Sequence, residues 1–243
     1  MEFRGRTALV TGAGQGIGRA VAMALAGQGA AVACNSLHAG RARETADEIT
    51  RRGGRAAAFP TDISQENQVS EMVSRLQKEL GSPSIVVHCA GILGERATIE
   101  NTGPDLWRSV LETNLTGAFL VSRALLPVLK QQPKSVFLHV SSSVGRKGRK
   151  EWGAYAVSKF GVEGLVQVLA DETGEGQPKI FVVNPGGTRT GMRAAAYPDE
   201  DPMSLPSAEE VGQAFLHIIG HAEQFPQGSG FEARDILKKL LQK

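Results

Sequence analysis

The chain has 243 residues, of which 27 are Lys or Arg and 25 are Asp or Glu, and 41% of all residues are hydrophobic. This ordinary balance excludes disordered and fibrous proteins. The formal net charge of +2 is too small to indicate a nucleic-acid or membrane partner through bulk electrostatics. Because no stretch approaches the roughly 18 apolar residues of a membrane span, the sequence predicts neither a membrane anchor nor secretion.

Short apolar runs alternate along the chain with helical patterns. The runs that read as buried parallel strands are 7–11, 30–35, 55–59, 84–88, 135–141 and 179–184. Apolar residues spaced three and four apart predict helices at 17–28, 69–80, 106–129 and 154–171. The alternation predicts an α/β fold with one doubly wound, Rossmann-type parallel sheet, helices on both faces, and a ligand beyond the carboxyl ends of the strands. One domain accounts for residues 1–243.

The C-terminal part departs from this alternation. Residues 191–209 are rich in Pro, Ser, Asp and Glu, and we expect them to form a mobile substrate lid. Ser207 and Glu210 have the spacing of a capping box that opens a helix to about residue 222. We expect residues 228–233 to form the last strand of the sheet.

The two cysteines, Cys34 and Cys89, are too few and too far apart for a disulfide framework or a paired-cysteine zinc site. The sequence therefore predicts a reducing, cytoplasmic location and no metal site.

A glycine-rich turn, TGAGQGIG at 11–18, joins the first strand to the first helix. Gly12, Gly16 and Gly18 lie where a nucleotide pyrophosphate would meet a helix N-terminus, which favours phosphate binding. The spacing fits neither the G-x-G-x-x-G pattern nor a P-loop. A tight turn without a ligand is the alternative.

The end of the second strand bears on the choice of nucleotide. No carboxylate stands there to bind the ribose of NAD; Ser36, Leu37, His38 and Arg41 follow instead. Their polar groups suit a 2′-phosphate, so NADP(H) is favoured and NAD(H) stays possible, although Arg41 could simply face solvent. Asp62, after the third strand, could bind the adenine edge or cap a helix, and the sequence leaves both open.

Four residues have the chemistry of a proton-transfer site. Tyr155 and Lys159 are four apart at a helix start, so the ammonium can lie near the phenol and lower its pKa. The hydroxyl of Ser142, after the fifth strand, could hydrogen-bond a substrate carbonyl. Asn114 lies in an apolar helical run, where it could bend the helix and hold a water; a surface Asn is the alternative.

Together these motifs closely resemble the short-chain dehydrogenase/reductase family. The resemblance rests on TGAGQGIG at 11–18, Asn114, Ser142, YAVSK at 155–159 and NPGGTRT at 184–190, in the family order and on the expected elements. It covers nearly the whole chain. The segments around YAVSK and NPGGTRT are similar to a bacterial branch described mostly as generic oxidoreductases, so the resemblance names no substrate, direction or stereochemistry.

The resemblance implies hydride transfer between a nicotinamide and a small carbonyl or alcohol. Tyr155 would donate the proton in reduction and accept it in oxidation, while Ser142 polarises the carbonyl. Lys159 would hold the nicotinamide ribose, and Asn114 would place a water that links Lys159 to solvent. The implied cofactor-binding residues are Gly12, Gln15, Gly16, Ile17, Gly18, Ser36, Asp62, Ile63, Ala90, Gly91, Tyr155, Lys159, Pro185, Gly186, Thr188 and Thr190.

The sequence departs from the family at two places. His88 and Cys89 stand where the family commonly has two Asn residues, so we expect a locally looser sheet, with Cys89 as a buried small hydrophobe rather than a redox centre. The 228–233 segment lacks the common family ending, which leaves the C-terminal subunit contact open. The two long helices resemble those that build family dimers, so we expect a homodimer or homotetramer.

The sequence leaves more than one interpretation of the substrate site and of the activity open. A basic loop, 146–150, invites an anionic substrate, although a solvated or ion-paired loop is favoured over it. Trp152 and Tyr197 are the expected pocket walls. An NADPH-dependent carbonyl reductase is the leading interpretation; a 3-oxoacyl-carrier-protein reductase and a noncatalytic nucleotide-sensing or binding protein are the alternatives.

Overall fold

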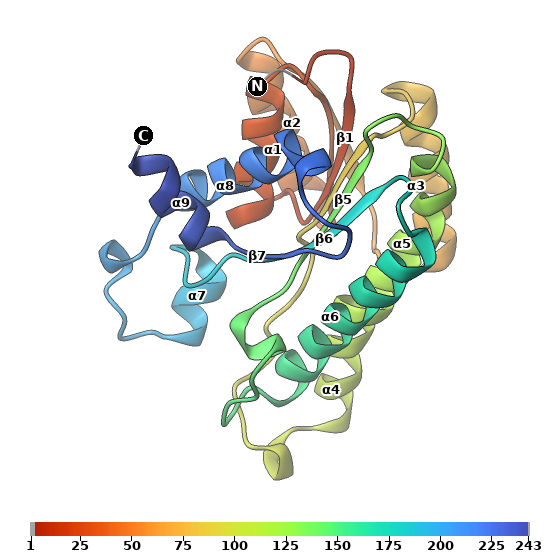
Figure 1. The fold of residues 1–243 in the computed structure, drawn as a ribbon. Helices are drawn as coiled ribbons and strands as arrows, with labels where there is room; N and C mark the ends of the chain where they lie inside the picture. Colours follow the sequence, from red (N-terminus) through yellow and green to blue (C-terminus); the bar gives the residue numbers. More distant parts are fainter. Residues whose placement is uncertain (1–2, 243) are drawn as a thin grey trace.

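One sheet of seven strands runs through the middle of the computed structural model, which describes residues 3–242 (Figure 1). The strand order is β3-β2-β1-β4-β5-β6-β7, and every neighbouring pair is parallel. The strands are β1 Thr7–Thr11, β2 Ala31–Ser36, β3 Arg55–Pro60, β4 Ile85–His88, β5 Val136–Val140, β6 Lys179–Asn184 and β7 Gly230–Glu232. The predicted doubly wound α/β fold is confirmed, and the predicted strands occur at their expected places.

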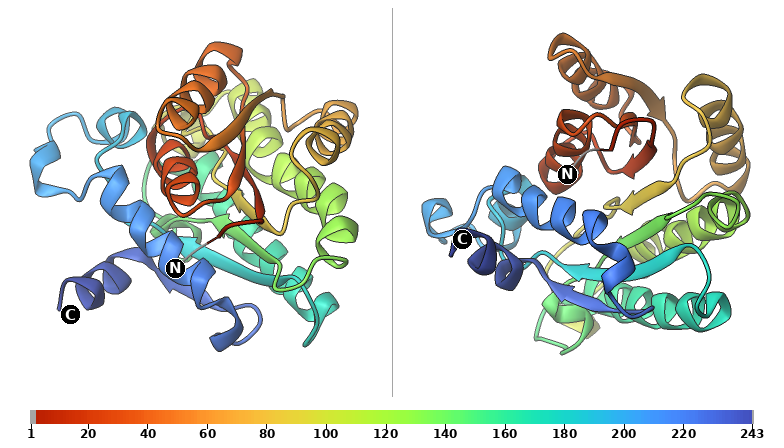
Figure 2. Two further views of the ribbon diagram at one scale, coloured as in Figure 1. Left: turned by 90° about the horizontal axis from the view of Figure 1, so that it is seen from above. Right: turned by 45° about the horizontal axis from the view of Figure 1, so that its top comes forward.

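Nine helices flank the sheet in the described part of the chain. They are α1 Gly16–Gly27, α2 Ala39–Arg51, α3 Glu66–Glu79, α4 Pro104–Leu111, α5 Gly117–Leu129, α6 Gly153–Thr173, α7 Gly191–Ala196, α8 Ala208–Gly220 and α9 Ala233–Leu241. Buried residues of α1, α2 and α8 form one apolar cluster with one face of the sheet, and those of α3, α5 and α6 form a second cluster with the other face (Figure 2). The sheet is thus buried on both sides, which explains why its strands read as continuous apolar runs.

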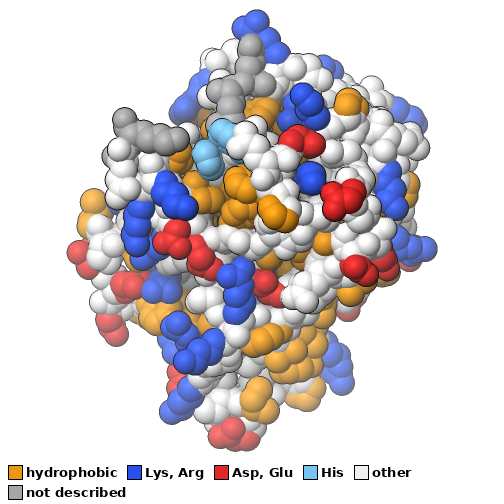
Figure 3. All heavy atoms as spheres, in the orientation of Figure 1, with side chains coloured by type: hydrophobic (Ala, Val, Ile, Leu, Met, Phe, Trp, Pro, Cys, Tyr) orange, Lys and Arg blue, Asp and Glu red, His pale blue; other side chains and the backbone are white. Residues whose placement is uncertain are grey.

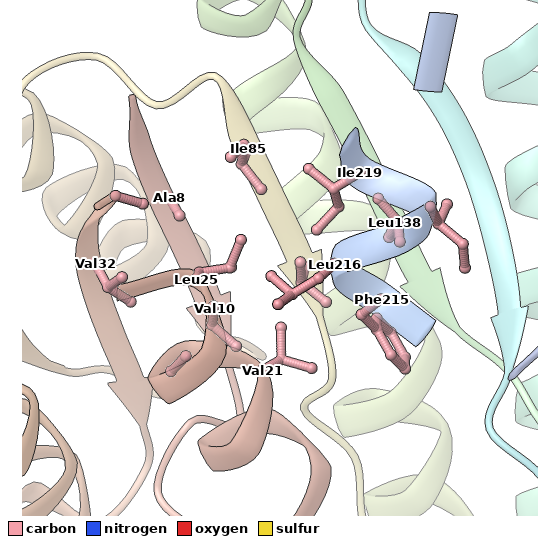
Figure 4. Packing of buried hydrophobic residues seen from close by; sticks show 14 of the residues in the cluster. Ala8, Val10, Val21, Leu25, Val32, Ile85, Leu138, Phe215, Leu216 and Ile219 are labelled. Carbon is pink, nitrogen blue, oxygen red and sulfur yellow. The ribbon is translucent and has the colours of Figure 1, made fainter. Parts of the chain in front are cut away.

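The first of these clusters holds α1 and α8 together. Val10 of β1, Leu25 of α1 and Phe215 of α8 are fully buried, and Figure 4 shows the side chains of the two helices meeting above the strands. The two helices are close at Gly212, where a Cβ would be in van der Waals contact with the backbone of Ala20 at 3.5 Å. The capping box of α8 is confirmed: Ser207 Oγ accepts from Glu210 N at 3.1 Å, and Glu210 Oε2 accepts from Ser207 N at 2.7 Å.

The predicted helix at 106–129 is interrupted. Helices α4 and α5 are joined by one π-helical turn, Glu112–Thr116, which places Asn114 at its centre. Such turns commonly mark functional sites within helices. The prediction that Asn114 lies at a distortion of this helix agrees with the geometry.

The C-terminal ends of the strands face the lower half of Figure 1, where the loops after β4 and β5 and helix α7 project beyond the sheet. Helices α2, α7 and α9 are absent from the predicted set. No helix within residues 3–242 is long and apolar enough to cross a membrane.

Candidate active site

A cavity of about 350 Å³ opens at the carboxyl ends of the strands. Its size suits a ligand site, and it lies where doubly wound sheets bind nucleotides. Every residue expected to bind the cofactor lines this cavity, as do Ser142, Tyr155 and Lys159. Asn114 is the exception, because it does not line the cavity.

The glycine turn between β1 and α1 forms one end of the cavity. A Cβ on Gly12 would lie 2.8 Å from Ala90 N, and one on Gly18 would overlap the carbonyl oxygen of Gly12. Gly12 and Gly16 adopt φ values of +67° and +54°, which side chains other than glycine disfavour. The turn leaves the N-terminus of α1 open to the cavity, so the space that side chains would fill fits a pyrophosphate.

The end of β2 lies beside this turn. Ser36, His38 and Arg41 line the cavity, and Arg41 Nη1 donates to Gln15 Oε1 at 2.9 Å. A Cβ on Gly14 would lie 2.7 Å from Arg41 Cβ and 2.8 Å from Ser36 Oγ, so the guanidinium and the hydroxyl gather around the glycine turn. Arg41 is exposed on α2, as the alternative expected, and it also lines the cavity and contacts the glycine turn.

Asp62 and Ile63 follow β3 and form the adjacent wall. Asp62 Oδ1 accepts from both Ser64 N, at 2.9 Å, and Ser64 Oγ, at 2.7 Å. The N-cap of α3 is Gln65, so the alternative that Asp62 caps this helix is wrong.

Asn114 is buried and fully hydrogen-bonded, so the surface alternative is wrong for this residue too. Its Oδ1 accepts from Ile92 N at 2.8 Å, while its Nδ2 donates to Ile92 O at 2.9 Å and to Ser158 Oγ at 3.0 Å. These bonds tie the π-helical turn to the loop after β4 and to α6. They fix Gly91, where a Cβ would lie 3.7 Å from Lys159 Nζ.

Ser142, Tyr155 and Lys159 meet where the end of β5 faces the start of α6. The Ser142 hydroxyl is hydrogen-bonded to the phenol of Tyr155. Lys159 Nζ donates to Val140 O at 2.8 Å and lies 5.7 Å from the centroid of the Tyr155 ring. Helix and strand thus hold the phenol, the hydroxyl and the ammonium at one place in the cavity.

Burial controls the protonation of this group. It raises the pKa of Tyr155 to about 12, against the smaller opposite effect of the Ser142 hydrogen bond. It lowers the pKa of Lys159 to about 8, with Cys89 and Glu163 opposing the change. The pKa of Tyr155 is therefore set mainly by burial, and the lowering effect expected of Lys159 is not among the causes of the shift. The phenol keeps its proton at neutral pH and is available as a donor.

The two departures from the family motif after β4 leave the sheet intact, contrary to expectation. His88 pairs in register with Thr11 and with His139, and the Thr11 hydroxyl hydrogen-bonds the Nδ1 of His88 at 3.0 Å. The same Thr11 oxygen accepts from Ala90 N at 3.1 Å. Burial raises the pKa of the Cys89 thiol to about 12, so the thiol stays protonated, as expected of a small hydrophobe rather than a redox centre.

The basic loop after Ser142 is ion-paired. Arg146 contacts Glu163 at 3.0 Å and Glu232 at 2.6 Å. None of Arg146, Lys147, Arg149 and Lys150 lines the cavity. The structure favours the ion-pair alternative over an anionic-substrate site in this loop.

The substrate end of the cavity contains residues that the sequence analysis missed. Leu93, Met192 and Arg193 line it together with the expected Trp152. Tyr197, the other expected wall, packs behind Trp152 rather than lining the cavity. No group of three potential metal-binding side chains occurs in the described part of the chain.

Comparison with known proteins agrees with this site. The model of the short chain dehydrogenase family matches residues 6–201. The uncharacterized oxidoreductase YciK of Escherichia coli (strain K12) is 37% identical over 94% of this chain and 92% of its own length. A 3-oxoacyl-[acyl-carrier-protein] reductase, FabG, of Pseudomonas aeruginosa is 32% identical over 97% of this chain and 92% of its own length.

The fold comparison gives the same family. A short chain dehydrogenase from Shigella flexneri, solved in complex with NADP, superposes with a TM-score of 0.89 at 35% identity, covering 95% of this chain and 98% of the other. The chain therefore belongs to the short-chain dehydrogenase/reductase family. It is an oxidoreductase that acts on CH–OH groups with NAD(P).

We expect Lys159→Met to stabilise the protein without added nucleotide at pH 7. Because the pKa of Lys159 is about 8 in the folded state against 10.5 for an ordinary lysine, folding disfavours the charged form. The shift corresponds to ~3 kcal/mol, less about 1 kcal/mol for the lost bond to Val140 O. Urea unfolding at pH 7 measures the difference.

Because folding lowers the pKa of Lys159, the stability gained by Lys159→Met depends on pH. The stability of the wild type should rise from pH 8 towards 10.5 as the buried lysine loses its proton, so the advantage of Lys159→Met shrinks there. Lys130→Met, at an exposed lysine, is the control and should show no such change. A Lys159→Met variant less stable than wild type at pH 7 contradicts the account.

Proposed function

We propose that the protein is an NADP(H)-dependent oxidoreductase that transfers a hydride between the nicotinamide and a small carbonyl or alcohol substrate, with Tyr155 as the acid/base. One observation carries the proposal. The protonated phenol of Tyr155, hydrogen-bonded to Ser142, lines the same cavity as the glycine turn. A proton donor and a glycine turn that can hold a pyrophosphate, in one cavity, are what carbonyl reduction by a nicotinamide dinucleotide needs.

The lining residues divide the cofactor between them. Gly12, Gln15, Gly16, Ile17 and Gly18 would hold the pyrophosphate at the N-terminus of α1. Asp62 and Ile63 would flank the adenine. Residues from the ends of β4 and β6 would surround the nicotinamide, with Lys159 on its ribose; those from the strand ends are Ala90, Gly91, Pro185, Gly186, Thr188 and Thr190.

NADP(H) is favoured over NAD(H) by the end of β2. Ser36, His38 and Arg41 offer a hydroxyl, an imidazole and a guanidinium, and no carboxylate follows the strand there to repel a 2′-phosphate. The Shigella flexneri relative bound to NADP supports the same choice.

The proton step uses three side chains of this chain. When bound, NADPH supplies the hydride to the carbonyl carbon. Tyr155 Oη donates its proton to the carbonyl oxygen, and the Ser142 hydroxyl hydrogen-bonds the same oxygen as charge develops on it. Lys159 follows Tyr155 one turn along α6 and would hold the nicotinamide ribose while the proton moves.

Asn114 acts as a positioning residue. Its amide is already engaged with Ile92 and Ser158, so it holds the π-helical turn in place. The relay water expected to link Lys159 to solvent would therefore bond backbone groups of this turn rather than the Asn114 amide.

A 3-oxoacyl-carrier-protein reductase is the second candidate, because that is the activity named for the Pseudomonas aeruginosa relative. Its chemistry at Tyr155 would be the same. A noncatalytic nucleotide-binding role has less support, since Ser142, Tyr155 and Lys159 line one cavity, as the proposed proton transfer requires.

The assembly we propose is a homodimer or homotetramer in the cytoplasm. Apolar side chains gather over α6 on the face shown in Figure 3, and the exposed ones on α5 and α6 are Phe119, Val157, Phe160 and Val168. An exposed apolar patch of this kind marks an interface. Light scattering that finds only monomers would refute the assembly. Residues 191–209, which extend from α7 beside the cavity, are our proposed lid.

Tyr155→Phe should lower kcat for carbonyl reduction by about 10²–10⁴-fold, the usual contribution of a positioned acid. NADPH affinity should stay within about threefold, because the ring remains. Stopped-flow oxidation of NADPH with a reactive dicarbonyl, such as 2,3-butanedione, measures the first quantity, and nicotinamide fluorescence measures the second. Turnover near the wild-type rate with intact binding removes Tyr155 from the role.

The nucleotide preference is tested by titration with NADPH and with NADH. We expect tighter binding of NADPH, and Arg41→Ala should weaken NADPH by about tenfold while changing NADH little, since a charge-assisted phosphate contact is lost. Arg108→Ala, on the outside of α4, is the control. Equal or tighter binding of NADH by the wild type contradicts the preference, and binding of neither nucleotide contradicts the proposed function.

A further inference from the structure

The substrate end of the cavity has an aromatic wall. Trp152, only 9% exposed, lines the cavity, and its ring centroid lies 5.6 Å from that of Tyr155 and 5.9 Å from that of Tyr197. Leu93 and Ala196 pack into the same small apolar cluster. A carbonyl held by the Tyr155 phenol therefore places its substituent near the indole of Trp152.

This end of the cavity holds no free positive charge among its described lining residues. Arg193 lines it, but its Nε and Nη2 donate to Glu200 at 2.6 and 2.7 Å, and its guanidinium stacks on Tyr197 at 3.8 Å. The remaining cation, Lys159, donates to Val140 O on the ribose side. A substrate with a carboxylate or phosphate next to its carbonyl would lose its hydration here without gaining an ion pair.

A second arginine, just outside the lining, fixes this wall. Arg96 follows β4; its Nη1 donates to Ala196 O at 2.7 Å, and its Nη2 donates to Glu151 Oε2 at 3.0 Å. Its guanidinium lies 5.5 Å from the Trp152 ring and 5.2 Å from the Tyr197 ring.

Arg96 thereby joins three segments that are distant in the sequence: the loop after β4, the loop before α6 and the end of α7. The isolated parallel bridge between Ala97 and Trp152 adds a backbone link at the same place. Loss of the guanidinium would release the end of α7 and Tyr197 from Trp152, so Arg96 determines how firmly the wall is held.

We propose that the substrates are uncharged ketones or aldehydes with a flat aromatic substituent that packs against Trp152, and that Arg96 is the positioning residue of this subsite. The inference rests on the proposed function and deepens it. The hydride from NADPH forms the new C–H bond at the carbonyl carbon while the C=O π bond breaks, and Tyr155 donates the proton to oxygen. The products are NADP⁺ and an aryl alcohol.

Three ketones of related shape test the subsite in the wild-type enzyme with NADPH. Acetophenone has the flat ring, cyclohexyl methyl ketone has a saturated ring of similar size, and 4-acetylbenzoate adds a carboxylate to the flat ring. We expect kcat/KM for acetophenone to exceed both others by about tenfold or more, the factor that a stacked aromatic contact or an unpaired charge commands. Equal or higher kcat/KM for the saturated or the carboxylate ketone overturns the proposal.

Two substitutions at Trp152 assign the preference to its ring. Trp152→Ala should bring the acetophenone to cyclohexyl methyl ketone ratio to about one, whereas Trp152→Phe should keep most of it. Trp107→Phe, outside the lining, is the matched control and should leave the ratio unchanged. NADPH affinity shows whether each variant is folded, and an unchanged ratio in a Trp152→Ala variant that binds NADPH contradicts the role of the ring.

Arg96→Met separates positioning from chemistry. It keeps the alkyl packing and removes the guanidinium, so KM for acetophenone should rise about tenfold while kcat stays within about threefold. Arg96→Lys, which retains one charged donor, should recover part of the KM. Arg108→Met, at an exposed ion pair, is the control. An unchanged KM, or a loss confined to kcat, overturns the assignment of Arg96.

Two outcomes distinguish failure of the aromatic subsite from failure of the proposed function. Reduction of 2,3-butanedione without a preference for acetophenone overturns the subsite and leaves the oxidoreductase intact. Absence of NADPH oxidation with every carbonyl in the set overturns both.

Discussion

The close approach of the β1–α1 turn to the end of β4 is the constraint on which the site depends. Gly12 lies against Ala90 N, and Gly18 lies against Gly12 O, so any side chain at these glycines would push the turn away from the sheet. Because β1 lies between β2 and β4 in the sheet, the same turn adjoins the end of β2 on one side and the end of β4 on the other. One backbone arrangement thus sets both ends of the cavity.

Burial sets the protonation of the groups proposed for proton transfer. It keeps the phenol of Tyr155 protonated and makes the charge on Lys159 costly, so the proposed proton-transfer site is expected to reduce the stability of the fold. The substrate end follows a different rule, because each guanidinium there is matched by a carboxylate: Arg193 by Glu200, and Arg96 by Glu151. Because both guanidinium groups are paired, the contact proposed for a substrate at this end is with the Trp152 ring.

Much of this arrangement is predictable from sequence, and the exceptions have physical reasons. Buried parallel strands and the Tyr155–Lys159 spacing leave local patterns that can be read directly. Helix α9 begins after a residue that provides no side-chain cap, and α7 has six residues, too few for a clear period. The contacts of Arg96 leave no local sequence pattern, because its hydrogen-bond partners lie 55 and 100 residues away in the chain. The pKa of Tyr155 depends on how deeply the phenol is buried, and the four-residue spacing of Tyr155 and Lys159 does not indicate that burial.

The central claim, hydride transfer between the nicotinamide and a carbonyl carbon in this cavity, is tested most directly with deuterium. NADPH labelled at one of the two C4 positions is mixed with the wild-type enzyme and a reducible ketone, and the alcohol is analysed by mass spectrometry and NMR. The account predicts one deuterium on the carbinol carbon from one C4 epimer only, because the cavity presents a single face of the ring. An alcohol without deuterium from either epimer would contradict it.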